Sequence, residues 1–452
     1  MGTGVRVAEL RATLDAGALG AELHERVADL FPLCRSITGD GVRETLRRLR
    51  RLCPLVVHEV PTGTPVFDWT VPREWNVRDA CVRDAAGARV IDFRRSNLHL
   101  VSYSVPVRAR MTLAELRPHL HTLPDRPDWV PYRTSYYEER WGFCLSHRAL
   151  QALPDGEYDV CIDASLEPGS LSYGECFLPG ETADEVLLSC HVCHPSLAND
   201  NLSAAVVAAC LAGHLARCAR RYSYRILFVP GTIGAVTWLA RNEAGLDRIR
   251  HGLVLAGLGD RGAPRYKKSR RGDAEIDRTV AHVLRTRPGP HEILEFSPYG
   301  YDERQYCSPG LDLPVGCLMR TPPGQYPEYH TSADDLGFVV PAQLADALDL
   351  SLEVVETLEG NGTYVNQCPR GEPQLGRRGL YRSLGGPADA GVEELPLLWT
   401  LNLSDGRHSL LEIAERSGCR FGAIRRAAEL LLAQGLLKEA AALPPAGAAR
   451  LP

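Results

Sequence analysis

The sequence predicts an α/β protein with a mainly parallel sheet flanked by helices, an inserted small β domain and a C-terminal winged-helix module. Three observations predict it. Apolar runs typical of strands alternate with helical patterns from residue 186 to 286, as in parallel sheets with crossover helices. Short β-rich runs separated by Pro, Gly and Asp turns fill residues 56–164. Two amphipathic helices joined by a short turn lie at 408–416 and 421–434, and a strand-like run follows them.

Taken in order, residues 5–52 are helical in pattern, with a break at 31–40. Strand-like runs of the β-rich segment follow at 66–71, 80–83, 89–93, 98–107, 133–145 and 156–162. Strands are then expected at 186–190, 224–229 and 252–256, and helices at 202–219, 235–246, 273–286 and 343–360. The expected domains are a discontinuous α/β core (1–55 and 165–370), an inserted β domain (56–164), a winged-helix-like domain (371–440) and a disordered tail (441–452).

The composition is that of a soluble globular protein, with 44% hydrophobic and 24% charged residues. A formal net charge of −5 gives no global attraction for nucleic acid or an anionic membrane. No apolar run is long enough to span a bilayer, and no signal peptide is evident. The 14 cysteines are scattered, so we expect free thiols and a cytoplasmic protein.

The C-terminal helix pair permits two interpretations. Its second helix carries Arg420, Arg425 and Arg426, which would suit DNA binding. Three arginines on one helix are more often a solvated face, and the chain is acidic overall. A packing or homo-oligomerisation module is therefore favoured over a nucleic-acid-binding one. Residues 397–403 could be a helix or a short strand.

Histidines and an aspartate follow two probable strands. His191 and His194 end the run that starts at Glu185, and Asp200 lies in the polar turn before the next helix. His330 lies in a loop after another apolar run. Ligands in open α/β sheets bind beyond the carboxyl ends of the strands, and His and Asp are usual zinc ligands. One such histidine would favour a structural hydrogen bond, whereas with two His-rich loops a metal site and structural hydrogen bonds are equal alternatives.

Three motifs carry a family resemblance. They are Cys193-His-Pro-Ser-Leu-Ala-Asn-Asp-Asn-Leu-Ser203, the run from Ser297 to Gly310 containing Tyr-Gly-Tyr-Asp-Glu-Arg-Gln-Tyr, and Pro327-Glu-Tyr-His-Thr-Ser-Ala-Asp334. With them the chain resembles bacterial aminopeptidase-like proteins that are distantly related to the di-zinc aminopeptidases. The resemblance covers most of the chain. It implies a zinc exopeptidase-like core with an inserted β domain and a C-terminal winged helix.

The resemblance also implies roles for particular residues. Asp200 matches the aspartate that bridges two metals in the di-zinc enzymes, and His194 (or His191) and His330 match histidine ligands. Asp260 aligns loosely with a further aspartate ligand. The di-zinc enzymes carry adjacent glutamates after the next strand, one as general base and one as ligand, and the aminopeptidase-like family usually keeps one. Here that place holds Gly231 and Thr232.

This departure changes the expected site. Without the second glutamate we expect one zinc ion, held by His194, Asp200 and His330, with the fourth position open for water. The general base must then come from elsewhere, and the candidates are Asp302, Glu303 and Glu328. For each of these carboxylates the alternative is a salt bridge within its loop.

The family's inserted domain lies over the cleft, so we expect His99, Tyr136 and Glu139 to reach the substrate; the alternative is that they make hydrogen bonds inside the domain. The resulting hypothesis is a zinc-dependent, aminopeptidase-like hydrolase of an amide or peptide bond, acting on a small peptide or aminoacyl conjugate. Because of Gly231, a non-hydrolytic ligand-binding descendant is the alternative. A third hypothesis is a transcription factor that uses the α/β part as a sensor.

Overall fold

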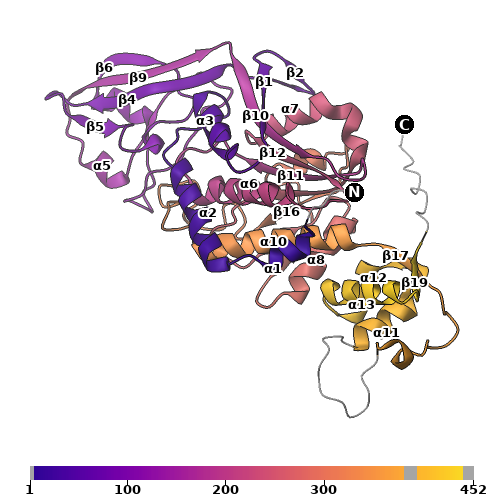
Figure 1. Ribbon diagram of the computed structural model, residues 1–452. Coiled ribbons are helices and arrows are strands. Elements are labelled where there is room, and N and C mark those ends of the chain that lie inside the picture. Colours follow the sequence, from indigo (N-terminus) through magenta and orange to yellow (C-terminus); the bar gives the residue numbers. More distant parts are fainter. Residues whose placement is uncertain (1–4, 381–393, 441–452) are drawn as a thin grey trace. The chain divides into compact units, whose positions relative to one another are not determined.

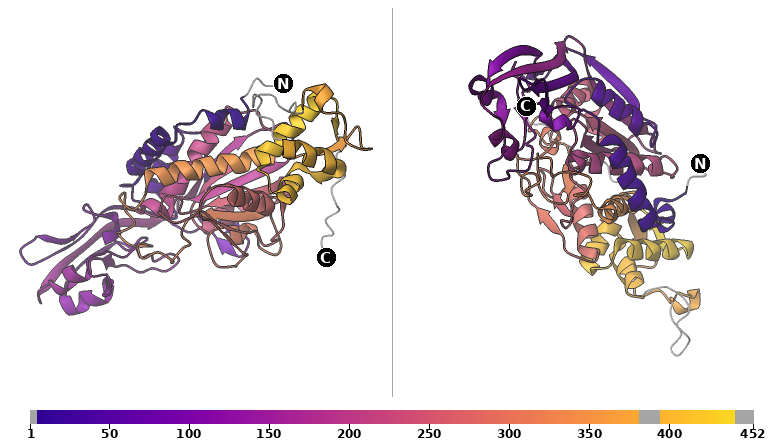
Figure 2. Two further views of the ribbon diagram at one scale, coloured as in Figure 1. Left: turned by 90° about the horizontal axis from the view of Figure 1, so that it is seen from below. Right: turned by 90° about the vertical axis from the view of Figure 1, so that its left-hand side faces the viewer.

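The computed structural model describes residues 5–380 and 394–440, which form two compact units. Unit 1 comprises Met1–Arg278 and Gly289–Leu352, and unit 2 comprises Thr279–Pro288 and Glu353–Pro452. Figures 1 and 2 show their elements. In the described ranges, no helix is both long and apolar enough to cross a membrane. The expected tail, 441–452, lies outside the described residues.

An eight-stranded mixed sheet organises unit 1. Its order is β1-β10-β12-β11-β13-β16-β14-β15. The strands are β1 (Val56–Pro61), β10 (Ser170–Leu178), β11 (Glu185–His191), β12 (Ser223–Val229), β13 (Ile249–Leu255), β14 (Arg265–Lys267), β15 (Glu292–Leu294) and β16 (Val315–Met319). The central strands β12, β11, β13 and β16 are parallel to one another, as expected, whereas β1, β10 and β14 pair antiparallel at the flanks. The carboxyl ends of the four parallel strands therefore meet at one edge.

Helices pack around this sheet. They are α1 (Val7–Ala12), α2 (Ala16–Leu30), α3 (Asp40–Leu49), α6 (Ala204–Leu215), α7 (Ile233–Asn242), α8 (Glu275–Thr286), α9 (Glu303–Tyr306) and α10 (Pro341–Gly360), of which α8 and α10 contribute residues to both units. Helix α6 is rich in alanine and buried along most of its length, and it packs on the parallel strands and on α2. Helix α7 packs against β10, where Trp238 Nε1 donates to Glu175 Oε2 at 3.0 Å.

The inserted domain is built on a four-stranded antiparallel sheet of order β5-β4-β9-β6. Its elements are β2 (Pro65–Val66), β3 (Trp69–Thr70), β4 (Glu74–Arg83), β5 (Arg89–Asp92), β6 (Val107–Thr112), α4 (Leu113–Leu116), β7 (Leu120–His121), β8 (Phe143–Cys144), α5 (His147–Gln151) and β9 (Glu157–Glu167). The prediction of a strand at 98–107 is wrong for most of that range. Ser96 accepts from Leu98 N and caps a short helical turn, and the positive φ of Tyr103 (73°) interrupts an extended path.

Unit 2 is a helix-turn-helix with a small sheet. Its elements are β17 (Thr363–Asn366), α11 (Glu394–Leu403), β18 (Asp405–Ser409), α12 (Leu410–Ser417), α13 (Phe421–Ala433) and β19 (Leu437–Glu439), with sheet order β18-β17-β19. Residues 397–403, left open by the sequence, are helical. A capping box of Ser409 and Glu412 starts α12, and Gly418 (φ 69°) ends it in the left-handed conformation, so the turn is encoded locally.

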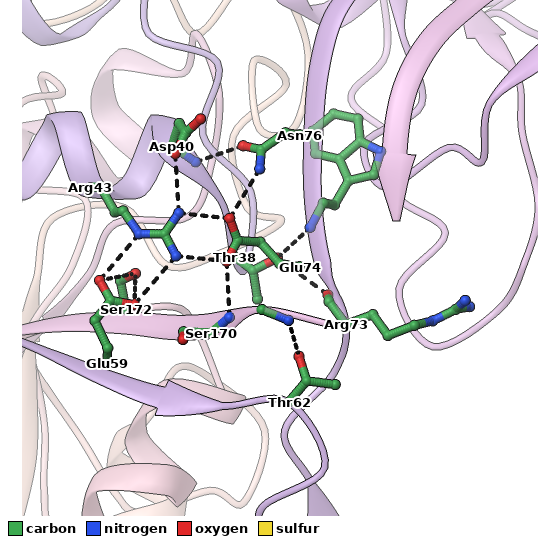
Figure 3. A network of polar contacts seen from close by, with 12 residues as sticks. Thr38, Asp40, Arg43, Glu59, Thr62, Arg73, Glu74, Asn76, Ser170 and Ser172 are labelled. Carbon is green, nitrogen blue, oxygen red and sulfur yellow. Dashed lines mark hydrogen bonds and ion pairs between the residues drawn. The ribbon is translucent and has the colours of Figure 1, made fainter. Parts of the chain in front are cut away.

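A partly exposed polar network joins the inserted domain to the large sheet (Figure 3). Arg43 of α3 donates from Nη1 and Nη2 to the two oxygens of Glu74 in β4 at 2.7 and 2.6 Å. Its Nε donates to Glu59 of β1 at 3.1 Å, and Glu59 also accepts from Ser172 of β10. Glu74 accepts from Ser170 N as well, at 2.9 Å. One guanidinium therefore connects a core helix, the edge of the large sheet and the first long strand of the inserted domain.

We predict that Glu74→Gln lowers the free energy of unfolding of unit 1 at pH 7 by about 1–3 kcal/mol, because the partly buried guanidinium loses its bidentate charged partner. The Arg43 hydrogen bond lowers the pKa of Glu74 from 4.5 to about 2, against the effect of burial. A depressed carboxyl pKa adds stability above its unfolded value, and that stability is lost as pH falls through the folded value.

Urea denaturation at several pH values tests this prediction. The difference between wild type and Glu74→Gln is expected to shrink between pH 4.5 and about 2. Glu138→Gln, at an exposed pair with Arg140, is the control and should change stability little. A difference that stays constant over this pH range would contradict the account.

Candidate metal centre

The candidate metal ligands lie where the parallel strands end. His191 is the last residue of β11, and the chain then turns through His194 into a kinked segment, Ala198–Ser203, in which Asp200 has a non-helical backbone conformation. Strand β12 ends at Val229, and Gly231 and Thr232 follow before α7. These side chains therefore converge beyond one edge of the sheet.

The carboxylate of Asp200 is at the centre of this site. Asp200 is fully buried, and its Oδ1 lies 2.9 Å from His191 Nε2 while its Oδ2 lies 3.1 Å from His330 Nε2. The ring of His194 stands 4.9 Å from that of His191 and 5.2 Å from that of His330. One donor atom from each of His191, His194 and Asp200 lies within 4.8 Å of the others. Such a compact set of nitrogen and oxygen donors fits a zinc ion.

The electrostatics suit a cation. Burial opposes the charge on Asp200, but His194 and the hydrogen bonds with His191 and His330 outweigh it and hold the pKa of Asp200 well below its ordinary value. Burial lowers the pKa of His194 to about 3, so its imidazole is neutral at pH 7. A charged carboxylate beside a neutral imidazole is the state in which both bind metal.

A second aspartate positions Asp200. Asp334 Oδ1 accepts from Asn199 N at 2.6 Å, and its Oδ2 accepts from Asp200 N at 3.0 Å. Burial raises the pKa of Asp334 to about 8, although both N–H groups favour its charged form. The peptide bond from Asp200 to Asn201 is cis. The backbone that carries the central carboxylate is thus held from the loop that also carries His330.

Tyrosines surround the histidines. Tyr301 stacks on His191 at 4.8 Å and donates to Asp200 Oδ1 at 3.2 Å, and Tyr329 stacks on His330 at 3.9 Å. Tyr132, from the inserted domain, lies 5.1 Å from the rings of both His194 and His330. Its backbone N donates to His330 O at 2.8 Å. Sequence reasoning missed these tyrosines and Asp334; Tyr301, Tyr329 and Asp334 lie inside the motifs, but no motif marks Tyr132.

Asp260, the remaining candidate ligand, and the three candidate bases differ in burial and in their hydrogen-bond partners. Asp260 is buried and accepts from Thr321 Oγ1 at 2.7 Å and Asn199 Nδ2 at 3.1 Å. Glu303 is buried in contact with the ammonium of Lys267. Glu328 is partly exposed, and its backbone carbonyl accepts from Thr331. Asp302 is buried, and its Oδ1 accepts from Thr232 N at 2.8 Å.

His99, Tyr136 and Glu139, which were expected to reach the substrate, make contacts in three different places. His99 Nδ1 lies 2.8 Å from Cys144 O, a contact within the inserted domain. Glu139 pairs with Arg73 and is 68% exposed. Tyr136 is hydrogen-bonded to Tyr132, with 3.0 Å between their hydroxyl oxygens. Of these three, Tyr136 is the one linked through Tyr132 to the histidines.

A side chain at position 231 would start next to the candidate metal ligands. A Cβ at this position would lie 3.3 Å from Cys193 Sγ and 3.7 Å from His191 Cβ. Its backbone N donates to Cys193 Sγ at 3.1 Å, and the same sulfur lies 3.5 Å from His194 Nδ1. A side chain here would therefore start beside the candidate ligands. The cysteine sulfur occupies part of the space that such a side chain would enter.

Comparison with known proteins agrees with this architecture. The model of a family described as a domain of unknown function (DUF4910) matches residues 24–361. The chain belongs to this family. A winged helix-turn-helix model matches residues 362–439. The chain is 50% identical over 419 residues to a Clostridium acetobutylicum protein named as a candidate polysaccharide biosynthesis protein with an aminopeptidase-like domain, covering 93% of this chain and 96% of the relative.

Solved structures share the fold of this chain. A crystal structure of a candidate peptidase from Clostridium acetobutylicum has a TM-score of 0.90 at 48% identity, covering 94% of this chain and 97% of that one. A zinc aminopeptidase from Bacillus subtilis has a TM-score of 0.55 at 12% identity, covering 75% and 94%. That distant likeness concerns the fold alone. The expected aminopeptidase-like family, α/β core and C-terminal winged helix are confirmed.

We predict that Asp334→Asn weakens zinc binding by about 10- to 100-fold, because an amide leaves one of the two backbone N–H groups without its acceptor and frees the turn that carries Asp200. Zinc affinity is measured by competition with a chromogenic chelator. Asp335→Asn is the matched control, since Asp335 is exposed and accepts from Gly337 N and Phe338 N in the same loop. Equal zinc affinity in Asp334→Asn and wild type would refute a positioning role.

Proposed function

We propose that this protein is a zinc-dependent hydrolase of an amide bond, of aminopeptidase type, acting on a small peptide or aminoacyl conjugate. The observation that carries the proposal is the group of His191, His194 and Asp200, with donor atoms within 4.8 Å of one another, beyond the carboxyl ends of parallel strands. The aminopeptidase names of the structures that share the fold support it.

His194 and Asp200 would hold the zinc ion together with His330, which lies 3.1 Å from Asp200 Oδ2, and His191, a member of the same compact group, is a further candidate ligand. Zinc supplies Lewis acidity, which polarises a substrate carbonyl and lowers the pKa of a water molecule. Tyr301 and Asp334 keep Asp200 oriented through the hydrogen bonds described above. Tyr132 of the inserted domain stands beside His194 and His330 and would shield this side of the site from bulk water.

Asp302 is the general base in this proposal. Its carboxylate is anchored to Thr232 N, the residue next to Gly231, so it lies at the strand end from which the family's glutamate is missing. Burial raises the pKa of Asp302 to about 6. A base with a pKa close to neutral accepts the proton of the attacking water and can return it to the leaving amine. Glu303 is less suited because Lys267 holds it in a buried ion pair.

We predict about one tightly bound zinc ion per chain, and its loss in His194→Ala and His330→Ala. Elemental analysis of protein dialysed against metal-free buffer measures the content. His214→Ala changes a half-buried histidine on α6 that lies outside this group and serves as the control. Wild-type protein that cannot be loaded with zinc would contradict the proposal.

We predict that Asp302→Asn lowers kcat for an aminoacyl amide by about 10²- to 10⁴-fold while zinc content stays unchanged, because the amide cannot accept the proton of water. Product release from a set of dipeptides measures this rate. Glu328→Gln is the matched control and should keep most of the activity. If Glu328→Gln removes activity and Asp302→Asn does not, the assignment of the base is wrong.

The second candidate function is non-hydrolytic ligand binding, and Gly231 favours it. Gly231→Glu would restore a carboxylate at this position, but its Cβ would press on Cys193 Sγ at 3.3 Å. Gly231→Glu is therefore compared alone and together with Cys193→Ala. Hydrolysis by these variants but not by wild type would support the non-hydrolytic alternative, whereas hydrolysis by wild type excludes it.

A further inference from the structure

The structure assigns a substrate-binding subsite to an exposed aromatic cluster on the inserted domain, in which the rings of Trp69 and Tyr137 meet and Phe67 stands exposed in the turn of the Trp69 hairpin. We infer that this cluster binds an aromatic or large apolar side chain of the amide substrate. The inference rests on the proposed function, because it extends the same site outwards from the metal centre.

The three rings are unusually exposed. Phe67 is 51%, Trp69 42% and Tyr137 50% exposed, and the rings of Trp69 and Tyr137 meet edge to face at 5.3 Å. Trp69 and Phe67 come from the hairpin β2–β3, and Tyr137 comes from a loop far along the chain. Exposed aromatic side chains gathered from separate segments mark a binding surface rather than a core.

The backbone at this cluster is strained. Phe67 has φ 54° and Tyr137 has φ 66°, in the left-handed region that bulky residues disfavour. Phe67 is the first turn residue of a two-residue hairpin, a position with positive φ where glycine is normally found. An exposed phenylalanine gains little from packing there. Strain of this kind is typical of functional sites.

The cluster is continuous with the metal centre. Strand β2 lies against α7, the helix that starts directly after Gly231 and Thr232. Tyr137 follows Tyr136, whose hydroxyl is bonded to that of Tyr132 beside the candidate ligands. Thr232 (φ 60°) and His330 (φ 55°) also have positive φ. The exposed cluster is therefore linked to His194 along the chain from Tyr137 to Tyr136, and then through the hydrogen bond between Tyr136 and Tyr132.

Most charges beside the cluster are paired, and the exposed Asp68 of its turn is negative, which favours an occupant without negative charge. Arg73, just after the hairpin, pairs with Glu139, just after Tyr137, and Glu138 pairs with Arg140 at 2.6 Å. These four charges neutralise one another in pairs, and the first pair joins the hairpin to the Tyr137 loop. Phe67 offers no hydrogen-bonding group, and Trp69 and Tyr137 add ring faces with one polar group each, so the cluster provides mainly aromatic contact. An aromatic or large aliphatic side chain matches it best.

The test is a binding measurement that does not depend on turnover. L-phenylalanine and L-alanine are titrated into zinc-loaded full-length protein by calorimetry. Wild type should bind phenylalanine about tenfold more tightly than alanine, and Trp69→Ala and Phe67→Gly should lose this preference. Phe177→Ala, at an exposed ring over Arg225 on β10, should keep it.

Phe67→Gly separates binding from folding. Glycine accommodates the positive φ of position 67, so this variant should keep or raise the melting temperature while it weakens phenylalanine binding. Unchanged phenylalanine binding in both Phe67→Gly and Trp69→Ala would overturn the assignment. Binding of N-acetylglucosamine that Trp69→Ala removes, without any preference for phenylalanine, would overturn it as well.

A second experiment, a hydrolysis assay, separates failure of this inference from failure of the proposed function. Phe-Gly and Ala-Gly dipeptides are incubated with wild type and the same variants, and products are quantified. If hydrolysis is absent but the binding preference and its loss are observed, the proposed function fails and the subsite stands. If hydrolysis occurs with equal efficiency for both dipeptides in all variants, the subsite fails and the proposed function stands.

Discussion

The buried carboxylate of Asp200 is the constraint on which the rest of the site depends. A charge without solvent is costly unless it is paired and hydrogen-bonded. Here both oxygens face histidine nitrogens, a tyrosine donates to one of them, and the backbone is held by Asp334. These partners come from β11, the turn after it and two later loops. The folded chain thus concentrates nitrogen donors around one negative charge, which is the arrangement a divalent cation stabilises.

The inserted domain contributes residues that surround the candidate metal site. Its Val130–Tyr132 segment pairs through the backbone with the His330 loop, and Ser332 Oγ accepts from Val130 N at 3.0 Å. Arg43 fixes the base of the domain through Glu59 and Glu74. Movement of the domain would therefore change the surroundings of His330. The position of the inserted domain is thus coupled to that of the candidate metal ligand His330 through this contact.

Part of this arrangement was predictable from sequence. Histidines at the ends of apolar runs, and an aspartate in the next turn, had to meet because parallel strands align their carboxyl ends. The role of Tyr132 was not predictable, since it lies in an irregular loop and reaches the site by tertiary packing. The pairing of Glu303 with Lys267 depends on how β14 is placed beside α9. The left-handed backbone of Phe67 could not be foreseen, because the sequence there lacks the glycine that usually signals it.

The most direct test of the central claim is a crystal structure with diffraction data on both sides of the zinc absorption edge. We expect one anomalous peak per chain, bound by His194, Asp200 and His330, with the carboxylate of Asp302 facing the open side of the ion. A peak bound elsewhere, or zinc-soaked crystals that show no peak among these residues, would contradict it.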